Sequence, residues 1–594
     1  MSDTVDAPVL PWWRSPIRWL GARFAEREQQ LLLVLSIMIG ALTGLVVVAL
    51  ILLTERLGLR LYPVGSPAWH RVVIPIIGSL SMGYILSRYF PNARGSGVTQ
   101  TKVALFVRDG VITLRTVFGK FFCTAVTLGS GIPLGPEGPS VQVGAGIASV
   151  LGRRLGLRTE SVKSLIPVGA AAAIAAAFNT PLAAVVYALE EIVGDLNAPV
   201  LGSIVLASAT AWLMLRLILG NNPLFQVPQY ELVHSAEFAI YALLGVIGGV
   251  FSAVFAKLMI QTRAGFRLLA ERTRWAQPAC GGLLVGLLGW WVPQVLGVGY
   301  SYVGEVLNGR MALRIMALLV VLKFVSVIMS YASGNAGGLF APSLFLGAMV
   351  GGVIGSVAHH LWPLSTAAPG AYALVGMGAL FAGIMRAPMT SFLMIFETTH
   401  DYAVIVPLMI ANLVSFLIAS QMQPLSITQA LAIQDGVHLP TAEIRRQFAE
   451  RIVAQVMRPA TDLLPAEMTV QEAVERTRTS TYHAWPVMND GRLAGIVRRT
   501  ALERAMAEGG GAKQLKELTE TLPFQHVHTD HPLDLALERM GLAKVDVLPV
   551  VSRADIYMVL GMVALSDILN SFGVSSTDAE NPLDVKGDKP AEQS

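Results

Sequence analysis

One acidic residue, Glu137, stands alone in a long apolar stretch. It is the only residue with a formal charge between Phe121 and Gly152. A carboxylate is costly to bury in hydrocarbon, so an ionisable residue inside a membrane segment is a functional candidate by default. The alternative is a glutamate that caps a helix in an ordinary loop. The isolation of Glu137 favours an acid that acts within a membrane segment.

The residues around Glu137 interrupt any helix that would run through this stretch. Glycine and proline stand on both sides of it, at Gly135, Pro136, Gly138 and Pro139. They exclude a continuous helix, and Pro139 suits the first turn of a new one. Such a helix directs its unpaired N–H groups and positive dipole end at whatever lies in front. In transporters, broken helices of this kind bind small ions near the middle of the bilayer.

The composition indicates a membrane protein with a soluble part. Of 594 residues, 53% are hydrophobic and 14% are charged, whereas about 25% are charged in soluble domains. The formal net charge of +4 is too small to suggest nucleic-acid binding. The two cysteines, Cys123 and Cys280, form neither a disulfide framework nor a metal-binding spacing. The 56 glycines are typical of closely packed membrane helices.

Both ends of the chain differ from its apolar middle. Residues 1–30 carry four arginines beside Trp12 and Trp13 and show no cleavable signal peptide, which predicts a cytoplasmic segment at the membrane interface. Residues 574–594 are polar and predict a disordered tail. Between them lie uncharged runs cut by glycine and proline. These runs predict tilted and half-length helices packed inside protein, over residues 31–436.

The membrane part contains an internal repeat. Pro139-Ser140, Gly144 and Gly152 recur 203 positions later as Pro342-Ser343, Gly347 and Gly355. A second set recurs at an offset of 207: Val168-Gly169, Pro181 and Glu190 match Val375-Gly376, Pro388 and Glu397. Ordered matches at nearly one offset predict two related halves, about 31–219 and 238–422. The matches alone leave open whether the halves are parallel or inverted.

The repeat brings a second helix start into view. Gly337-Gly338-Leu339-Phe340-Ala341-Pro342 matches the stretch around Glu137. Two helix N-termini could then converge on one point and stabilise an anion through backbone N–H groups. A fully cationic site would hold an anion too tightly for quick release. A third break, Gly95-Ser96-Gly97, could add a hydroxyl, although such a triplet is usually only a turn.

These residues resemble the CLC family of chloride channels and chloride/proton antiporters. Gly95-Ser96-Gly97-Val98-Thr99 is similar to the family's GSGIP loop, Gly135–Pro139 to its GxEGP loop, and Gly338–Pro342 to its GIFAP loop. The resemblance covers about 31–436. It implies a polytopic α-helical membrane fold of two inverted-repeat halves with tilted and broken helices. It also implies a homodimer with one pore per subunit, surrounded by membrane lipid.

The resemblance assigns roles to particular residues. Ser96 would contact chloride through its hydroxyl, and Leu339 and Phe340 through their backbone N–H groups. Glu137 would be the gating glutamate, which occupies an anion position when ionised and leaves it when protonated. Glu191, next to Glu190, would take protons from the cytoplasmic side. From the residues alone, this acidic pair is equally a helix end at the interface. Lys120 matches a buried basic position, against the alternative of a lysine that reaches to the interface.

The sequence departs from the family pattern at three places. Thr428, in Ser426-Ile-Thr428, stands where the inner-gate tyrosine of the anion site is expected. Its smaller side chain predicts a thinner inner barrier and looser coupling. Pro136 replaces a residue that is often basic. Val98-Thr99 replaces Ile-Pro, which loosens the backbone behind Ser96.

The chain changes character after Asp435-Gly436, where charged residues return. Residues 437–573 resemble tandem CBS domains, about 454–509 and 522–573, each with a helix followed by two short strands. This predicts a soluble α/β part after the membrane domain. The resemblance implies adenine nucleotide as a ligand, with Asp567 on the ribose; the alternative is a purely structural, dimerising role.

We therefore expect a multi-pass protein of the cell membrane, with both termini cytoplasmic, that exchanges chloride for protons. The rival is a passive chloride channel, gated by voltage or pH, which Thr428 favours. No cofactor is expected to be required. A hydrolytic metal site would need a pattern such as His-Glu-x-x-His, and a nucleophilic enzyme a serine with a placed base. The chain shows neither pattern. A cation transporter would need acidic or carbonyl-rich coordination, whereas the breaks in this chain present helix N-termini.

Overall fold

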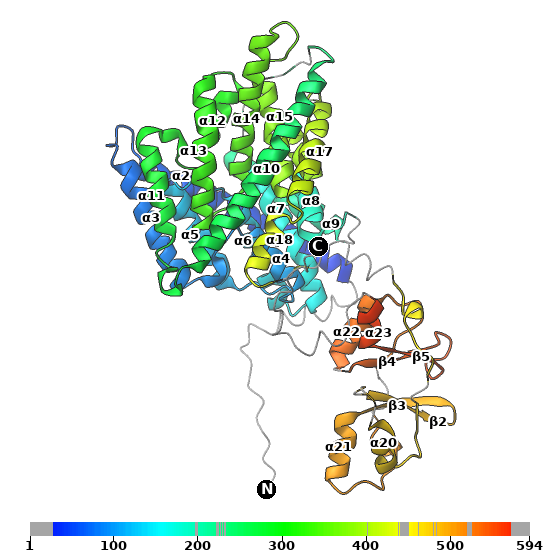
Figure 1. Cartoon of the computed structure of the whole chain (residues 1–594). Coiled ribbons are helices and arrows are strands. Elements are labelled where there is room, and N and C mark those ends of the chain that lie inside the picture. The colour runs from blue at the N-terminus through cyan, green and yellow to red at the C-terminus, as the bar shows by residue number, and fades with distance from the viewer. Residues whose placement is uncertain are drawn as a thin grey trace, which may run out of the picture. The chain divides into compact units, whose positions relative to one another are not determined.

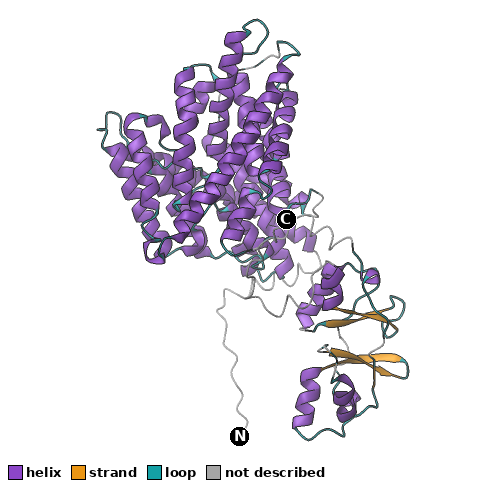
Figure 2. Cartoon of the chain, in the orientation of Figure 1, coloured by secondary structure: helices purple, strands orange, loops and turns teal. Residues whose placement is uncertain are grey.

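The computed structural model describes residues 28–196, 200–220, 233–400, 402–437, 451–460, 463–478, 484–519, 525–543 and 545–571, with isolated positions between them. It divides into two compact units, Met1–Leu439 and Pro440–Ser594. The first unit is built of helices, and strands occur in the second (Figure 2). The predicted N-terminal segment, up to residue 27, and the predicted tail at 574–594 lie outside the described residues.

The first half of the membrane unit is a series of helices of very different length (Figure 1). In chain order they are α2 (Glu28–Leu61), α3 (His70–Arg88), the turn η3 (Pro91–Ala93), α4 (Val98–Phe106), α5 (Leu114–Gly129), α6 (Glu137–Arg154), α7 (Thr159–Phe178), α8 (Pro181–Tyr187), the π-helical turn η4 (Ala188–Val193) and α9 (Leu201–Leu219).

The second half repeats this order of long and short helices. It consists of α10 (Glu237–Leu268), the turn η5 (Glu271–Thr273), α11 (Pro278–Trp291), the turn η6 (Pro293–Val295), α12 (Tyr300–Leu307), α13 (Leu313–Ala332), α14 (Phe340–Leu361), α15 (Pro369–Met385), α16 (Pro388–Thr399) and α17 (Ile405–Met422). The short helix α18 (Ile427–Gln434) follows it.

Contacts between the halves are reciprocal. The Gly135 N–H donates to the Gly338 carbonyl at 2.9 Å, and the Gly338 N–H donates back to the Gly135 carbonyl at 2.7 Å. These two residues precede α6 and α14, so the two helix starts meet. Figure 1 draws α14 and α15 above α6 and α7. Reciprocal contacts with helices leading in opposite directions are what an inverted repeat produces, as the family resemblance implies.

The described residues contain eight helices long and apolar enough to cross a membrane. Others are too short. Helix α4 has 9 residues and α12 has 8, which is about 14 Å at most, against a hydrocarbon core of about 30 Å. Half-length helices leave backbone groups that need partners within the protein. Their ends lie where α7 and α15 form a buried interior, and in α15 every residue from Gly370 to Met385 is buried.

Close helix contacts explain part of the glycine content. A side-chain carbon at Gly144 in α6 would collide with the backbone oxygen of Gly169 in α7. Its repeat counterpart, Gly347 in α14, would collide with the backbone oxygen of Gly376 in α15. Glycine at these positions lets two backbones touch. Each half therefore has the same close contact between two of its helices, α6 with α7 and α14 with α15.

The second unit contains two helix and strand motifs. The first consists of β1 (Leu464–Pro465), α20 (Val470–Thr477), β2 (Ala484–Asn489), β3 (Arg492–Arg498) and α21 (Arg499–Ala507). Its sheet has the order β1-β2-β3, with β2 and β3 antiparallel. The second consists of α22 (Leu533–Ala543), the antiparallel pair β4 (Val547–Val551) and β5 (Val559–Ala564), and α23 (Leu565–Ser571). Short turns lie at Val453–Gln455 and Leu515–Glu517.

One apolar cluster joins the two motifs, and the first motif has a further cluster of its own around Trp485 and Val487. Leu493 and Ile496 of β3 belong to the same buried cluster as Leu548 and Val550 of β4. The strand–turn–strand patterns of the sequence are thus found, with the preceding helices in place. The finer domain boundaries at 437, 454, 509, 522 and 573 remain predictions, and several of them fall outside the described residues.

Candidate functional site

A small cavity lies where the two halves of the membrane unit meet. Ser96, Leu339, Phe340 and Thr428, the residues predicted to hold the anion, all line it, together with Gly138. Its free volume is about 10 Å³, which is about the space of one water molecule. The structure thus brings three chain segments, far apart in sequence, around a space suited to a small ion.

Glycine and lysine shape the loop that carries Ser96. Gly95 and Gly97 have φ angles of +95° and +99°, a region that favours glycine. Lys120 of α5 is fully buried, and its Nζ donates to the backbone carbonyls of Ala93 at 3.1 Å and Gly95 at 2.5 Å. Lys120 therefore holds this loop and does not reach to the membrane interface. In the second half, Lys323 donates to the Val295 and Gly297 carbonyls at 3.0 and 2.7 Å.

The Ser96 hydroxyl is buried and has no well-formed hydrogen bond within the described residues, although Tyr331 lies beside it. This hydroxyl can therefore donate its hydrogen toward the cavity that Ser96 lines. The cavity that Ser96 lines also receives the starts of α6 and α14, whose dipoles favour negative charge. Hydroxyl and helix dipoles together suit an anion better than a cation.

Glu137 is the first residue of α6 and is completely buried. Its Oε1 accepts a hydrogen bond from the Tyr300 hydroxyl of α12, and its Oε2 has no hydrogen-bond partner within the described residues. The backbone N–H of Ala341, in the first turn of α14, faces the same carboxylate. Gly138, the residue that follows Glu137, lines the cavity, so the start of α6 that carries this carboxylate forms part of the cavity wall.

Tyr300 was not singled out from the sequence, although a signal for it exists. Gly297-Val298-Gly299-Tyr300 repeats the pattern of Gly95-Ser96-Gly97-Val98 at an offset of 202. Gly297 and Gly299 also have positive φ angles, of +64° and +86°. Extending the repeat to this third loop would have placed Tyr300 at the start of a broken helix facing the same centre.

Glu191 lies at the other side of the cavity wall and bonds directly to Thr428. The Thr428 hydroxyl donates to Glu191 Oε1 at 2.9 Å. The Lys102 ammonium of α4 makes an ion pair with the same oxygen at 3.1 Å. Glu191 is buried, with 5% of the residue exposed. The carboxylate predicted to carry protons is therefore one hydrogen bond away from a residue predicted to line the anion site.

Glu190 has different partners. Its carboxylate accepts the backbone N–H groups of Met389 and Thr390 at 3.1 and 2.8 Å, at the start of α16. Its repeat counterpart Glu397 accepts those of Leu182 and Ala183 at 2.9 and 2.7 Å, at the start of α8. Each half thus caps a helix of the other, and the role predicted for Glu190 in proton transfer stays a prediction.

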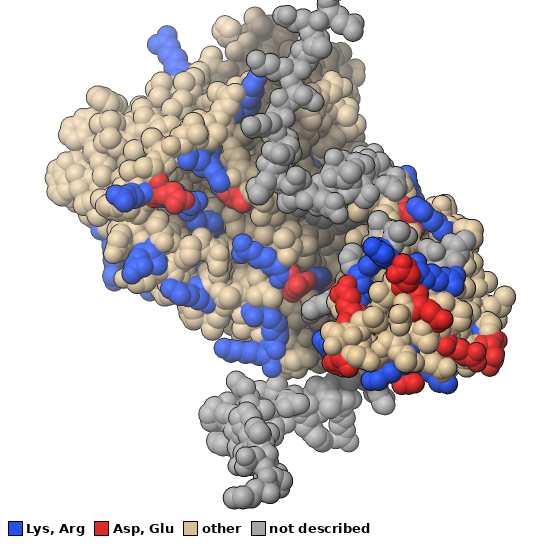
Figure 3. All heavy atoms as spheres, turned by 60° about the horizontal axis from the view of Figure 1, so that its bottom comes forward, with Lys and Arg blue, Asp and Glu red and all other residues tan. Residues whose placement is uncertain are grey.

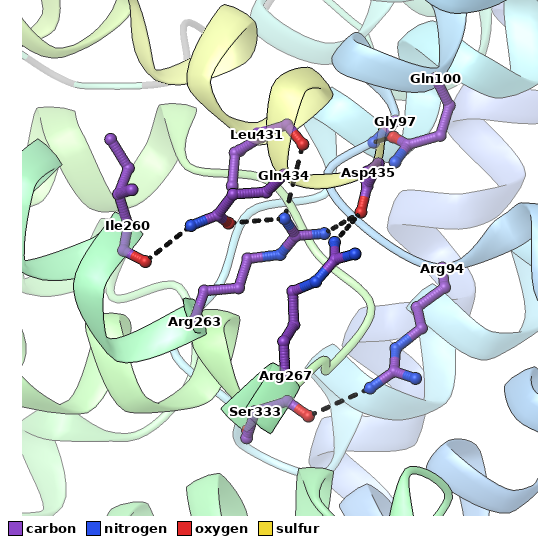
Figure 4. Close-up of polar contacts among 10 residues, drawn as sticks. All are labelled: Arg94, Gly97, Gln100, Ile260, Arg263, Arg267, Ser333, Leu431, Gln434 and Asp435. Carbon is purple, nitrogen blue, oxygen red and sulfur yellow. Dashed lines mark hydrogen bonds and ion pairs between the residues drawn. The ribbon is translucent and has the colours of Figure 1, made fainter. Parts of the chain in front are cut away.

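A larger cavity of about 520 Å³, here called the vestibule, opens beside the central one. The Ser96 loop separates the two cavities: Gly95 and Thr99 line the vestibule, and Ser96 and Val98 line the central cavity. Five arginines and two acidic residues line the vestibule: Arg94, Arg108, Arg263, Arg267, Arg274, Glu271 and Asp435. Figure 4 shows Arg263 and Arg267 meeting at Asp435, with distances of 2.7 and 2.6 Å. The excess of guanidinium groups gives this vestibule a positive potential that concentrates anions.

In the soluble unit, Asp567 lies in the first turn of α23 and is 7% exposed. It forms an ion pair with Arg458, and its Oδ2 accepts the Ala564 N–H at 3.3 Å. A ribose at this carboxylate would have to share it with Arg458. Among the residues that the structure describes, no group of three or more His, Cys, Asp or Glu side chains could hold a metal ion.

The inverted halves, the buried glutamate and the small cavity between two helix starts define a multi-pass membrane protein that moves anions. Comparison with known proteins agrees. The model of the voltage gated chloride channel family matches residues 77–420, and the CBS domain model matches residues 453–508. The chain belongs to the CLC family of chloride channels and chloride/proton antiporters. Its function is therefore CLC-type anion transport and not enzymatic catalysis.

The relatives include exchangers and a channel. An H(+)/Cl(-) exchange transporter, ClcA, of Vibrio campbellii is 33% identical over 361 residues, covering 59% of this chain and 77% of that protein. A ClcB-like chloride channel protein of Ralstonia nicotianae is 34% identical over 386 residues, covering 63% and 89%. Among solved structures, a slow cyanobacterial Cl−/H+ antiporter aligns with a TM-score of 0.63 at 26% identity, covering 68% and 97%.

A eukaryotic CLC transporter shares the fold over a longer part of the chain. It aligns with a TM-score of 0.64 at 20% identity, covering 91% of this chain and 98% of that one. The membrane helices followed by a small α/β CBS domain are therefore a known arrangement of the family.

Proposed function

We propose that the protein exchanges chloride for protons across the membrane and that Glu137 is the gate. The observation that carries this proposal is the placement of two buried glutamates around one small cavity. Glu137, at the start of α6, directly precedes Gly138 of the cavity wall, and Glu191 bonds to Thr428 of the same wall. A passive pore has no need of a second buried acid on the route. Two relatives described as chloride/proton antiporters, one known by sequence and one by structure, support the same proposal.

The gate follows from competition for one site. Ionised, the Glu137 carboxylate satisfies the positive dipole ends of α6 and α14 in place of chloride. Protonated, it loses the charge for which this site is selective, so that chloride can take its place. Tyr300 holds the ionised form through a hydrogen bond. Glu191 supplies protons from the vestibule side, and Ser96, Leu339, Phe340 and Thr428 surround the anion.

The vestibule is the cytoplasmic entrance in this proposal. Figure 3 shows lysine and arginine side chains spread over the face of the membrane unit that this view brings forward. Cytoplasmic segments carry an excess of such residues. Both termini are then cytoplasmic, and the positive vestibule gathers chloride for the central cavity.

The test is the flux of chloride and protons measured together in proteoliposomes. A chloride gradient should drive protons in the opposite direction. Glu191→Gln should stop proton movement and leave chloride movement. At saturating chloride, Glu137→Gln should give chloride flux that no longer depends on pH. Proton flow unchanged in Glu191→Gln would remove this residue from the pathway, and steep pH dependence in Glu137→Gln would overturn the gate assignment.

The second candidate is a passive chloride channel with weak or no proton coupling. Thr428 favours it, because a threonine closes the inner side of the cavity less than a tyrosine would. The ClcB-like relative is described as a chloride channel. The reversal potential separates the two functions: at constant chloride gradient, a pH gradient shifts it for an antiporter and leaves it unchanged for a channel.

Two further assignments belong to the proposal. The family resemblance implies a homodimer, which the mass of the purified complex in detergent would test. It also implies adenine nucleotide binding by the soluble unit at Asp567. Titration with AMP and ATP would test this, with Asp567→Ala expected to abolish binding and an absence of binding to the native chain counting against it.

A further inference from the structure

A continuous chain of hydrogen bonds connects the wall of the central cavity to Glu191. Ser426 Oγ accepts the Gln429 N–H at 3.3 Å, which leaves its hydrogen for Thr428 Oγ1 at 3.1 Å. The Thr428 hydroxyl then donates to Glu191 Oε1 at 2.9 Å. Thr428 is 3% exposed, so bulk water does not replace these bonds.

A hydroxyl has one hydrogen to donate. While the Glu191 carboxylate accepts it, the Thr428 side chain cannot offer that hydrogen to an anion in the cavity. Instead its lone pairs and methyl group remain, and neither attracts an anion. A protonated Glu191 no longer requires this hydrogen, since it carries a hydrogen of its own that can be donated to Thr428 Oγ1.

From this geometry we infer that Thr428 is a coupling residue, through which a proton on Glu191 strengthens anion binding in the central cavity. The inference rests on the proposed exchange function and adds the physical link between its two sites. With Glu191 ionised, Ser426, Thr428 and Glu191 form one donor chain directed away from the anion. With Glu191 protonated, the Thr428 hydroxyl turns and donates to the anion.

The groups around Glu191 fit this role. Lys102 faces the carboxylate from α4 and makes an ion pair with it at 3.1 Å. Tyr187 of α8 interacts electrostatically with Glu191. The neighbouring Glu190 accepts hydrogen bonds from the start of α16 instead. Thr428 is therefore the group through which the protonation state of Glu191 reaches the cavity directly.

The linkage is reciprocal, because coupling between two sites acts equally on both. A proton on Glu191 should raise chloride affinity, and chloride should raise the affinity of Glu191 for a proton. One hydrogen bond to a charged group, gained or lost, predicts an effect of about tenfold. The coupling between the proton on Glu191 and chloride is thus positive and acts through a hydrogen bond. Glu137 acts differently, because its ionised carboxylate competes with chloride for the site.

The experiment uses the full chain in detergent with Glu137→Gln as background, since this substitution removes the proton of the gate. Chloride affinity is measured by titration calorimetry at pH 5 and pH 8, and proton uptake on addition of chloride is recorded in weakly buffered solution. We expect tighter chloride binding at pH 5 than at pH 8, by up to about tenfold, and a measurable uptake of protons.

Variants in this background isolate the link. Thr428→Val and Glu191→Gln should each abolish the pH dependence and the proton uptake, whereas Thr428→Ser should keep both. Thr428→Ala replaces Thr428→Val if that variant does not fold. Thr127→Val is the matched control, because the buried Thr127 hydroxyl has no hydrogen-bond partner within the described residues. This control should retain the linkage.

Chloride binding that is independent of pH in the Glu137→Gln background, or linkage that survives Thr428→Val, overturns the inference. Neither result affects the exchange proposal, which stands or falls on proton movement by the native chain in proteoliposomes. Conversely, a native chain without proton movement but with this linkage would be a channel whose anion affinity responds to pH.

Discussion

At the scale of single residues, the gate depends on one hydrogen bond that crosses the two halves. Glu137 belongs to the first half and is fully buried, Tyr300 belongs to the second half and is partly buried, and both stand at the start of a broken helix. A hydrogen bond to a charged group contributes about 1.5–3 kcal/mol. Tyr300 therefore favours the ionised, closed position of the carboxylate over its release.

We predict that Tyr300→Phe raises chloride flux at neutral pH by about tenfold or more, because the ionised carboxylate loses a bond worth about 1.5–3 kcal/mol. Flux into proteoliposomes with a radioactive or fluorescent chloride readout measures this. Tyr302→Phe, on the same helix, is the matched control and should change nothing. A normally folded Tyr300→Phe protein with native flux would show that this bond does not hold the gate.

At the scale of elements, the short helices depend on carboxylates from the opposite half. Glu190 caps α16 and Glu397 caps α8, each with two backbone N–H groups. Helix N-termini without partners inside protein are costly, because each buried, unsatisfied N–H group carries a penalty of about 1–3 kcal/mol. Each glutamate thus links the two halves, because it caps the start of a helix in the other half.

We predict that Glu190→Ala and Glu397→Ala each lower the free energy of unfolding by about 1–3 kcal/mol, with similar shifts in melting temperature in detergent. If Glu190 only caps α16, the ratio of chloride to protons should stay native in both variants. Loss of proton movement in Glu190→Ala alone would place this residue on the proton pathway.

At the scale of the whole molecule, the chain consists of two compact units that differ in what stabilises them. The soluble unit carries a histidine pair, His528 and His531, shortly before α22. His531 Nδ1 accepts the His528 N–H at 3.2 Å, which requires a neutral ring nitrogen. Burial, and then the charges of Arg539, His528 and Arg553, lower the pKa of His531.

This shift predicts the direction of a pH effect on the soluble unit. Unfolded His531 titrates near its ordinary value of about 6.5, so the unfolded chain binds more protons than the folded chain just below that pH. Stability is thus fully present above it and is lost as pH falls through the lowered value. The melting temperature of this unit should fall between pH 7.5 and 5, and less so in His531→Asn. His400→Asn, in the membrane unit, is the control, and the melting temperature of the soluble unit should fall between pH 7.5 and 5 as in the native chain.

Much of the membrane architecture was readable because its signals are local or periodic. Glycine and proline must stand where a backbone breaks, and a lone charge such as Glu137 is conspicuous among apolar residues. The repeat offsets then pointed to Gly338–Pro342 as the partner of the first helix start. The same reasoning stopped short of Tyr300, because the third repeated loop has only two glycines in common with its counterpart.

The sequence by itself determined that there are two related halves, which helices are broken, and which acids lie in apolar surroundings, since each of these follows from residue type and order along the chain. Only the tertiary structure decided which groups touch. The bond from Thr428 to Glu191 joins residues 237 positions apart. Glu190 caps a helix of the opposite half, as Glu397 does in return, so the adjacent residues Glu190 and Glu191 have different partners although they look alike in sequence. Contacts of this kind depend on how distant segments pack, and no local pattern encodes them.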